Sequence, residues 1–337
     1  MSDIPAVADL HCDLLAYLLV GELTDESRSP LDTRALCSLP QLRDGGVGLQ
    51  VMAIFTLTEK DWTRFGIREA ELFATMLDEH DQLVRPVRSA ADLGADERVG
   101  LMAAIENASA FAEEDEPLDD AFARFETVEK LAGPLLYVSM TWNTENRFGG
   151  GNASDNVGLK PDGRVLLDFL AEQRTSIDLS HTSPRLADDI LDYTAKMGLD
   201  LPVLASHSVY AGVKDIPRNL RDEAAREVAE RGGVIGLNLL RSFVEGEASD
   251  AFVRQLRHAR DLGVLDRAQV LGTDFFYRLD IPPEQLKDED DFFPEYGDAT
   301  CHPRLLRDLG EAFELDAEAL ADLAHGRAYR FVERVLG

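Results

Sequence analysis

The sequence has few cysteines, few basic residues and no long apolar segment. Its 337 residues include three cysteines, an odd and sparse set that argues against a disulfide framework and for a reducing compartment. The 34 lysines and arginines are outnumbered by 63 aspartates and glutamates, which gives a formal net charge of -29. Such a surface repels phosphate backbones and anionic membranes, so neither nucleic acid nor a membrane is an expected partner.

The N-terminal apolar run Leu14 to Val20 lacks the flanks of a targeting segment. Acidic residues (Asp3, Asp9 and Asp13) precede it, whereas a signal peptide begins with a basic region. No apolar span reaches the roughly 18 residues that a transmembrane helix needs. We therefore expect a soluble, cytoplasmic protein.

Short apolar, β-prone runs recur along the chain with helix-length segments between them. They cover residues 6–11, 47–55, 99–106, 135–141, 175–181, 202–207, 233–240 and 269–274. Nearly continuous apolar character is typical of parallel strands that are covered on both faces. The alternation predicts an α/β protein with a (β/α)8 barrel, and an open doubly wound sheet is the alternative. No Gly-x-Gly-x-x-Gly motif follows the first run, and polar residues end many runs, which favours the barrel.

The segments between these runs have the spacing of amphipathic helices. Residues 118–131, 184–197, 220–231 and 250–262 fit this pattern, and Ser183 before Pro184 is a typical helix start. A closing helical region is expected over 316–336, as two helices that meet near Gly326. The connections 142–160 and 275–303 are longer than a scaffold needs, so we expect them to bind substrate or cover the site. The whole chain, 1–337, is then one barrel domain.

The segment Asp9-Leu10-His11-Cys12-Asp13 ends the first predicted strand. Alternate side chains of a strand share a face, so Asp9, His11 and Asp13 are expected to point the same way. A histidine and a carboxylate two residues apart can chelate one metal ion, although so short a motif is weak by itself. Similar positions at the ends of later runs hold Glu106, His181, His207 and Asp274.

Three histidines and three carboxylates exceed the needs of one catalytic zinc, which keeps three protein ligands and an open position. Two ions that share a carboxylate explain the number better, and zinc suits these ligands, with manganese or cobalt also compatible. The expected arrangement places His11 and Asp13 on one ion, His181 and His207 on the other, Glu106 between them, and Asp274 beside the first ion. A hydroxide that bridges the two ions would attack a peptide carbonyl, and Asp274 would pass a proton to the leaving amine.

Six short motifs, taken in order, resemble the renal or membrane dipeptidase family of dinuclear zinc peptidases. They are Asp9-Leu10-His11-Cys12-Asp13, Ile105-Glu106, Ile177-Asp178-Leu179-Ser180-His181-Thr182-Ser183, Ser206-His207-Ser208, Arg218-Asn219 and Gly272-Thr273-Asp274-Phe275. The resemblance implies a (β/α)8 fold, two zinc ions per chain and hydrolysis of dipeptides, with a D-residue tolerated at the C-terminal position in some members. It also implies the metal ligands named above, a catalytic role for Asp274 beside the bridging Glu106, and a homodimer.

The resemblance also points to substrate-binding residues. Arg218 falls where the family places the arginine that binds the substrate carboxylate, and a guanidinium suits that geometry. Trp142, followed by Asn143, stands where known members carry a histidine that contacts the oxygen of the scissile carbonyl. An indole donates one hydrogen bond but cannot exchange a proton at neutral pH. Two further departures are Phe276-Tyr277 in place of Asp-Gly and Asn107-Ala108 in place of Gly-Gly.

The leading hypothesis is a metal-dependent dipeptidase. One alternative keeps the two metal ions but changes the substrate to another small amide, such as an N-acyl amino acid or a lactam. A second is a non-catalytic binding protein that retains the barrel and holds little metal. The helical positions of His80, His258 and His325 give them no expected role, and His302 in the last long connection is left open.

Overall fold

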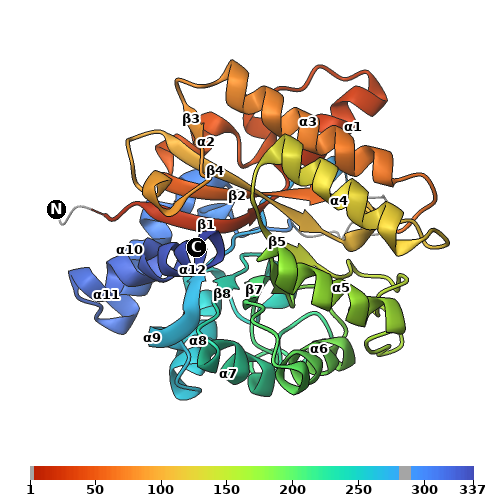
Figure 1. Ribbon diagram of the computed structural model, residues 1–337. Helices are drawn as coiled ribbons and strands as arrows, with labels where there is room; N and C mark the ends of the chain where they lie inside the picture. The colour runs from red at the N-terminus through yellow and green to blue at the C-terminus, as the bar shows by residue number, and fades with distance from the viewer. Residues whose placement is uncertain (1–3, 281–289) are drawn as a thin grey trace.

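The computed structural model describes residues 4–280 and 290–337, and its centre is a closed barrel of eight parallel strands (Figure 1). Each of the eight expected runs coincides with one of them to within a few residues, which confirms the (β/α)8 prediction. The strands of the barrel are β1 Val7–Cys12, β2 Val47–Phe55, β4 Val99–Glu106, β5 Leu135–Ser139, β6 Ser176–Asp178, β7 Val203–Ser208, β8 Ile235–Leu237 and β9 Gln269–Leu271.

The barrel closes because β1 pairs with both β2 and β9 while β2 pairs with β4. A ninth strand, β3 Val84–Pro86, lies beside the start of β4, with Val84 opposite Val99. The sequence did not predict β3, since three residues that end in proline carry too little strand signal. It adds to the wall of the barrel without interrupting the ring.

Helices cover the outside of the barrel (Figure 1). They are α1 Leu14–Thr24, α2 Leu39–Asp44, α3 Thr63–Glu79, α4 Leu118–Ala132, α5 Pro161–Gln173, α6 Pro184–Met197, α7 Asp222–Glu230, α8 Ala248–Asp261, α9 Leu265–Ala268, α10 His302–Phe313, α11 Ala317–Ala321 and α12 Arg327–Leu336. The expected start of α6 is confirmed, because the Ser183 hydroxyl accepts a hydrogen bond from the Leu186 N–H at 3.0 Å. The expected pair of C-terminal helices is also confirmed, with a π-helical turn, Asp322–Gly326, joining them.

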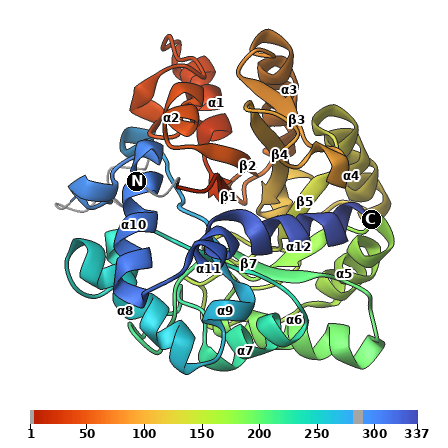
Figure 2. The same ribbon diagram turned by 90° about the vertical axis from the view of Figure 1, so that its left-hand side faces the viewer.

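Two apolar cores hold the barrel together. The larger lies between the strands and the surrounding helices. The smaller fills the barrel, where Leu10, Met102 and Leu204 pack in the same cluster as Phe331 and Val335 of α12. Figure 2 shows α12 crossing the end of the barrel at which the strands begin. The carboxyl ends of the strands, at the opposite end, are therefore left to form a site.

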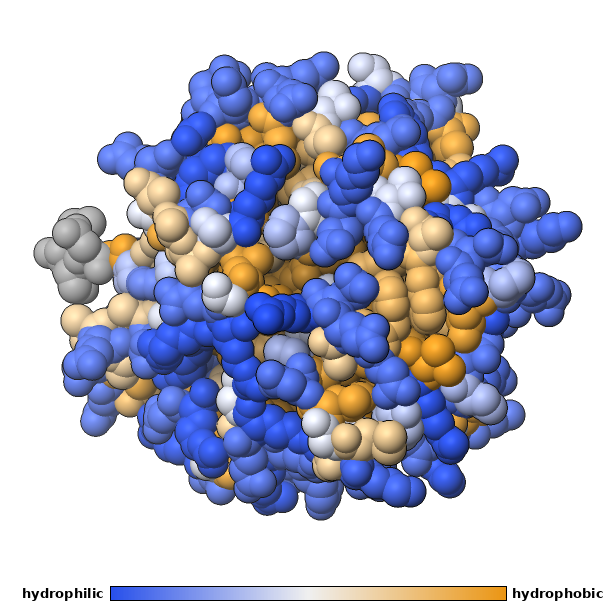
Figure 3. Space-filling model, in the orientation of Figure 1, coloured by the Kyte–Doolittle hydropathy of each residue, from blue (hydrophilic) through white to orange (hydrophobic). Residues whose placement is uncertain are grey.

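The expected long connection 142–160 contains no helix or strand, and one isolated bridge, Gly151 to Thr182, ties it to the segment after β6. Of the expected connection 275–303, residues 281–289 lie outside the described residues, and α10 begins at His302. No helix within the described ranges is long and apolar enough to cross a membrane. Hydrophilic side chains cover most of the face in Figure 3, as the acidic composition leads one to expect.

Candidate metal centre

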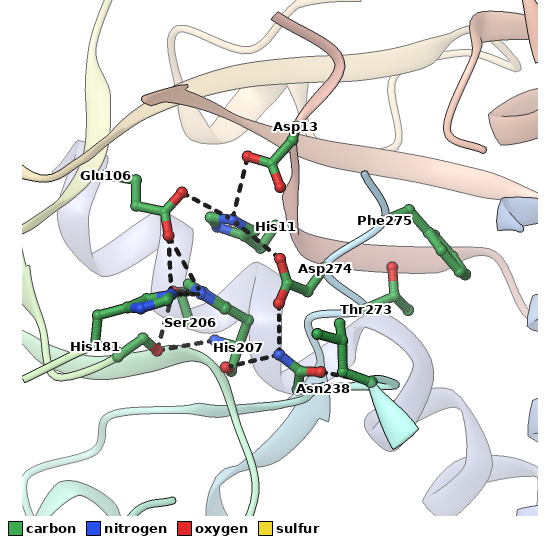
Figure 4. Close-up of polar contacts among 12 residues, drawn as sticks. His11, Asp13, Glu106, His181, Ser206, His207, Asn238, Thr273, Asp274 and Phe275 are labelled. Carbon is green, nitrogen blue, oxygen red and sulfur yellow. Dashed lines mark hydrogen bonds and ion pairs between the residues drawn. The ribbon is translucent and has the colours of Figure 1, made fainter. Parts of the chain in front are cut away.

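The six predicted metal ligands meet at the carboxyl ends of the barrel strands (Figure 4). His11 and Glu106 lie among the last two residues of β1 and β4, and His207 lies near the end of β7. Asp13 directly follows β1, and His181 and Asp274 each lie three residues after the end of a strand, β6 and β9. Strands that are far apart in the sequence thus bring all six side chains together at one opening of the barrel, here called the mouth.

The two oxygens of Glu106 face different partners. Its Oε2 lies 3.5 Å from His11 Nε2, and its Oε1 lies 2.9 Å from His181 Nε2 and 3.7 Å from His207 Nε2. His11 Nε2 also lies 3.6 Å from Asp274 Oδ1 and 3.8 Å from Asp13 Oδ1. The carboxylate of Glu106 therefore stands between one group around His11 and another made by the two later histidines.

Hydrogen bonds on the other ring nitrogen set the tautomer of two histidines. The Tyr137 hydroxyl donates to the Leu10 carbonyl at 3.0 Å, so it accepts from His11 Nδ1–H at 2.7 Å. The Asn143 Oδ1 accepts from His181 Nδ1–H at 2.9 Å. With the proton on Nδ1, each Nε2 is left with a lone pair that points toward the centre.

His207 is held in the same tautomer by a relay of two side chains. The Ser206 hydroxyl donates to Asp178 Oδ2 at 2.7 Å and accepts from His207 Nδ1–H at 2.7 Å. Asp178 is fully buried and also accepts hydrogen bonds from the hydroxyl of Ser139 and the N–H of Ser180. Partners of this kind fix ligand histidines in metalloproteins and raise their basicity.

These nitrogens and oxygens crowd together at the centre. The His181 and His207 Nε2 atoms are 2.9 Å apart, and each has its proton on the other nitrogen. His11 Nε2 is buried and has no hydrogen-bond partner within the described part of the chain. Imidazole nitrogens and carboxylate oxygens that converge in this way need a cation, either a proton or a metal ion. The donor set therefore fits metal ions that accept nitrogen and oxygen ligands.

The pKa values follow from burial and from the excess of carboxylates. Burial lowers the pKa of His181 to about 4 and that of His207 well below its usual value, so both are neutral near pH 7. Burial opposes the charged form of His11 too, but the nearby carboxylates, with Glu106 first, raise its pKa to about 10. Burial raises the pKa of Asp274 to about 6. The protons on His11 and Asp274 thus provide positive charge that bound metal ions would otherwise provide.

Two of the six residues adopt a left-handed backbone conformation. The φ angles of His181 and Asp274 are +64° and +65°, a region that residues with a Cβ rarely occupy. Such strain persists where surrounding contacts enforce it, and it is concentrated at functional sites. Each lies three residues after the end of a short strand, β6 or β9, where the left-handed turn directs its side chain into the mouth.

Asn238, which sequence reasoning missed, orients Asp274. Its Oδ1 accepts from the Leu240 N–H at 2.7 Å, so its NH₂ group must point the other way and donates to Asp274 Oδ2 at 2.7 Å. The second oxygen of Asp274, Oδ1, remains turned toward His11. One oxygen of this carboxylate is therefore fixed and the other is available at the centre.

Arg218 reaches the same centre, as the sequence predicts. Its guanidinium is buried, donates to the His207 carbonyl at 2.9 Å and to the Ser208 hydroxyl at 3.2 Å, and lies 3.2 Å from His181 Nε2. Its Nε has no hydrogen-bond partner among the described residues. The ring of Phe243 packs against the guanidinium at 5.0 Å. A fixed positive charge thus lies beside the two later histidines.

The two other predicted substrate-binding residues, Trp142 and Asn143, differ in what their side chains contact. Trp142 is half-buried, 6.1 Å from the ring of His181 and edge-on to Phe55 at 5.2 Å, so it forms a wall of the mouth. The side-chain oxygen of Asn143, by contrast, accepts a hydrogen bond from His181.

The expectation that Asp9 shares a face with His11 is wrong. The register of β1 against β2 shifts between Asp9 and Cys12, and the Asp9 carboxylate binds Thr273 and His302 instead.

A (β/α)8 barrel with histidines and carboxylates converging at the carboxyl ends of its strands defines the class of metal-dependent barrel hydrolases. Residues 1–335 match the sequence profile described as "Membrane dipeptidase (Peptidase family M19)". The chain belongs to this family, and the resemblance seen in the six motifs is confirmed.

Individual relatives are more distant. An uncharacterized dipeptidase of Schizosaccharomyces pombe is 30% identical over 161 residues, which are 46% of this chain and 38% of the relative. A dipeptidase of Clonostachys rogersoniana is 26% identical over 117 residues, 34% of this chain and 29% of the relative. The matches thus span between about a third and a half of this chain, and about a third of these curated relatives' length.

Solved structures share the fold along almost the whole chain. A metallopeptidase from Rhodobacter sphaeroides, bound to a phosphinate mimic of the dipeptide L-Ala-D-Ala, has a TM-score of 0.80 at 22% identity and covers 99% of this chain and 100% of its own. The dipeptidase AC, a metallopeptidase of family M19, has a TM-score of 0.81 at 23% identity with the same coverage. At this level of identity the likeness establishes the fold.

Proposed function

We propose that the protein is a dipeptidase that hydrolyses the peptide bond of dipeptides with the help of two zinc ions. The observation that carries the proposal is the position of Glu106, whose two oxygens face two separate groups of ligands. Membership of the membrane dipeptidase family supports the activity. The dipeptide mimic bound to the Rhodobacter sphaeroides protein supports the substrate class, including a D-residue at the C-terminal position.

His11 and Asp13 would hold one ion, with Asp274 beside it, and His181 and His207 would hold the other. Glu106 would contact both ions. Manganese and cobalt are compatible with the same donors. Two bound divalent ions lower the pKa of water and polarise a carbonyl oxygen, which is the chemistry that amide hydrolysis requires.

The residues of the chain then have distinct tasks. Asp274 would move the proton, because its Oδ1 faces the centre while its Oδ2 is held by Asn238. The proton that leaves the attacking water ends on the amine of the departing amino acid. Asn238 holds the other oxygen of Asp274, so the carboxylate keeps one orientation throughout.

Arg218 would bind the free carboxylate of the dipeptide. Its buried guanidinium has donors in a planar fork, and its Nε is unpaired among the described residues. Trp142 would line the pocket for a substrate side chain with its apolar face. Asn143 would orient His181 through its side-chain oxygen.

Two measurements test the proposal. Metal analysis of purified, zinc-loaded protein is expected to find two zinc ions per chain. An assay on free dipeptides such as L-Ala-L-Ala and L-Ala-D-Ala is expected to show turnover that is lost when the substrate amine is acetylated or its carboxylate is amidated. Turnover that survives acetylation would indicate an N-acyl amino acid hydrolase or a related amidase. Little metal and no turnover would indicate a binding protein.

The cytoplasmic location and the homodimer stay predictions. The three cysteines are all free and buried, which supports a reducing compartment for the proposed enzyme.

A further inference from the structure

His302 and Asp9 form a buried pair outside the proposed metal ligands. Both side chains have no exposed surface, and His302 Nε2 lies 3.1 Å from Asp9 Oδ2. His302 Nδ1 donates to the carbonyl of Ala299 at 2.6 Å, and this oxygen can only accept. Both ring nitrogens of His302 therefore face oxygen atoms, one of the Ala299 carbonyl and one of the Asp9 carboxylate.

Asp9 joins the two strand ends that carry His11 and Asp274. Its Oδ1 accepts from the backbone N–H of Thr273 at 2.9 Å and of His11 at 3.3 Å. Its Oδ2 accepts from the Thr273 hydroxyl at 2.5 Å as well as from His302. Thr273 directly precedes Asp274, so one carboxylate binds the backbone next to both residues.

Further contacts continue this junction toward the mouth. The N–H of Asp274 donates to the carbonyl of His11 at 3.2 Å, and the N–H of Asp13 donates to the carbonyl of Phe275 at 3.0 Å. His302 packs edge-on to the ring of Phe275, with the ring centres 6.3 Å apart. The start of α10 thus reaches the seam between β1 and β9 from the outside of the barrel.

We infer that His302 is a positioning residue that acts through Asp9 to hold His11 and Asp274 at the spacing that the first metal ion requires. The inference rests on the proposed metal site. Four groups bind the Asp9 carboxylate, and His302 is the one that comes from outside the two strands. Without His302, the buried Asp9 Oδ2 loses one of its two partners, and the Asp9 side chain holds both strand ends less firmly.

The test compares His302→Leu, which removes both donors, with His302→Gln, which keeps an N–H that can reach Asp9. His258→Leu is the matched control, because His258 Nε2 also pairs with an aspartate, Asp222, at 2.8 Å, but on the helices outside the barrel. Zinc affinity is measured by competition with a chromogenic chelator, and the melting temperature of each zinc-free protein is measured in parallel.

His302→Leu is expected to weaken the binding of one zinc ion about 10- to 100-fold, as the loss of an outer-shell partner typically does. His302→Gln should lose less, and His258→Leu should bind zinc as the wild type does. A purely structural role would lower the melting temperature of both leucine variants and leave zinc affinity unchanged, which overturns the inference. If His302→Leu does not fold, Thr273→Val, which removes one donor to Asp9, must weaken zinc binding in the same direction.

Wild-type protein that binds no zinc overturns the proposed function together with this inference. Zinc affinity that is equal in wild type, His302→Leu and Thr273→Val overturns the inference alone.

Discussion

Each histidine at the centre depends on a partner that holds its second nitrogen. For His11 this partner is Tyr137, whose hydroxyl proton is already given to Leu10. For His207 it is the relay of Ser206 and Asp178. Neutral imidazole can take either tautomer in water, so these hydrogen bonds select the one that presents Nε2 to a metal. The affinity for metal is therefore expected to depend on these hydrogen-bond partners as well as on the ligands themselves.

Tyr137→Phe tests this dependence. The variant keeps the buried ring but removes the acceptor for His11 Nδ1–H, so zinc affinity should fall about 10- to 100-fold. Chelator competition measures the change. Tyr193→Phe is the control, because its hydroxyl binds Asp168 on the outer helices. Equal zinc affinity in Tyr137→Phe and wild type would contradict the role given to the tautomer.

Arg218→Lys tests the proposed carboxylate contact. A lysine cannot reproduce the planar fork, so KM for free dipeptides should rise about 10- to 100-fold, the equivalent of one charge-assisted hydrogen bond. Steady-state kinetics measure it, with kcat expected to change less. Arg221→Lys serves as the control, since that side chain is partly exposed and pairs with Asp188. A fall in kcat with unchanged KM would assign Arg218 to another step.

The sequence predicted which side chains meet at the centre. It did not predict the hydrogen-bond partners that orient them. His11, Glu106 and Asp274 each end an apolar run, and the barrel brings such ends together. Tyr137 and Asn238 lie inside or beside buried strands, where one more polar residue gives no signal of a partner on another strand. Asp9 was misplaced because strict alternation fails where the register of β1 shifts.

At the level of elements, the eight strands of the ring were predictable because each is a continuous apolar run. The irregular backbone was not. Asn107, which stands where the family has glycine, has a φ of +76°, and its side chain binds the Thr56 carbonyl at 2.8 Å and the Asn146 amide at 3.1 Å. Asparagine tolerates this conformation better than most residues, so the departure from Gly-Gly preserves the turn after Glu106.

Helix α12 closes the end of the barrel opposite the metal centre, and Phe331 is its central contact at 2% exposure. Phe331→Ala should lower the free energy of unfolding by about 3–5 kcal/mol, because it leaves a cavity in the inner core. Denaturant unfolding measures the loss. Leu23→Ala, at a side chain that is 57% exposed, should change little. Zinc affinity of the folded Phe331→Ala protein should match the wild type, and a large loss there would show that the two ends are coupled.

For the molecule as a whole, stability should depend on pH and metal together. In the metal-free fold, burial raises the pKa of Asp274 from 3.8 to about 6, so stability is lost as pH rises through that interval. The pKa of His11 is raised from 6.5 to about 10, so its contribution is present below pH 6.5 and lost as pH rises toward 10. In the proposed metal-loaded enzyme, zinc would take the place of both protons.

The increase in melting temperature that zinc produces should therefore be larger at pH 8.5 than at pH 5.5. Differential scanning calorimetry with and without zinc measures it. His207→Ala, which lacks a proposed ligand, should show a smaller zinc effect at both pH values. An increase that is equal at the two pH values, or larger at pH 5.5, would contradict the exchange of protons for metal.

The seam between β1 and β9 has a consequence for how the protein is made. His11 and Asp274 lie 263 residues apart in the sequence, yet they become neighbours only when β9 closes the ring against β1. Under the proposed function, His11, Asp13 and Asp274 can hold the first ion together only after the ring has closed, so its binding reports on the completion of the barrel.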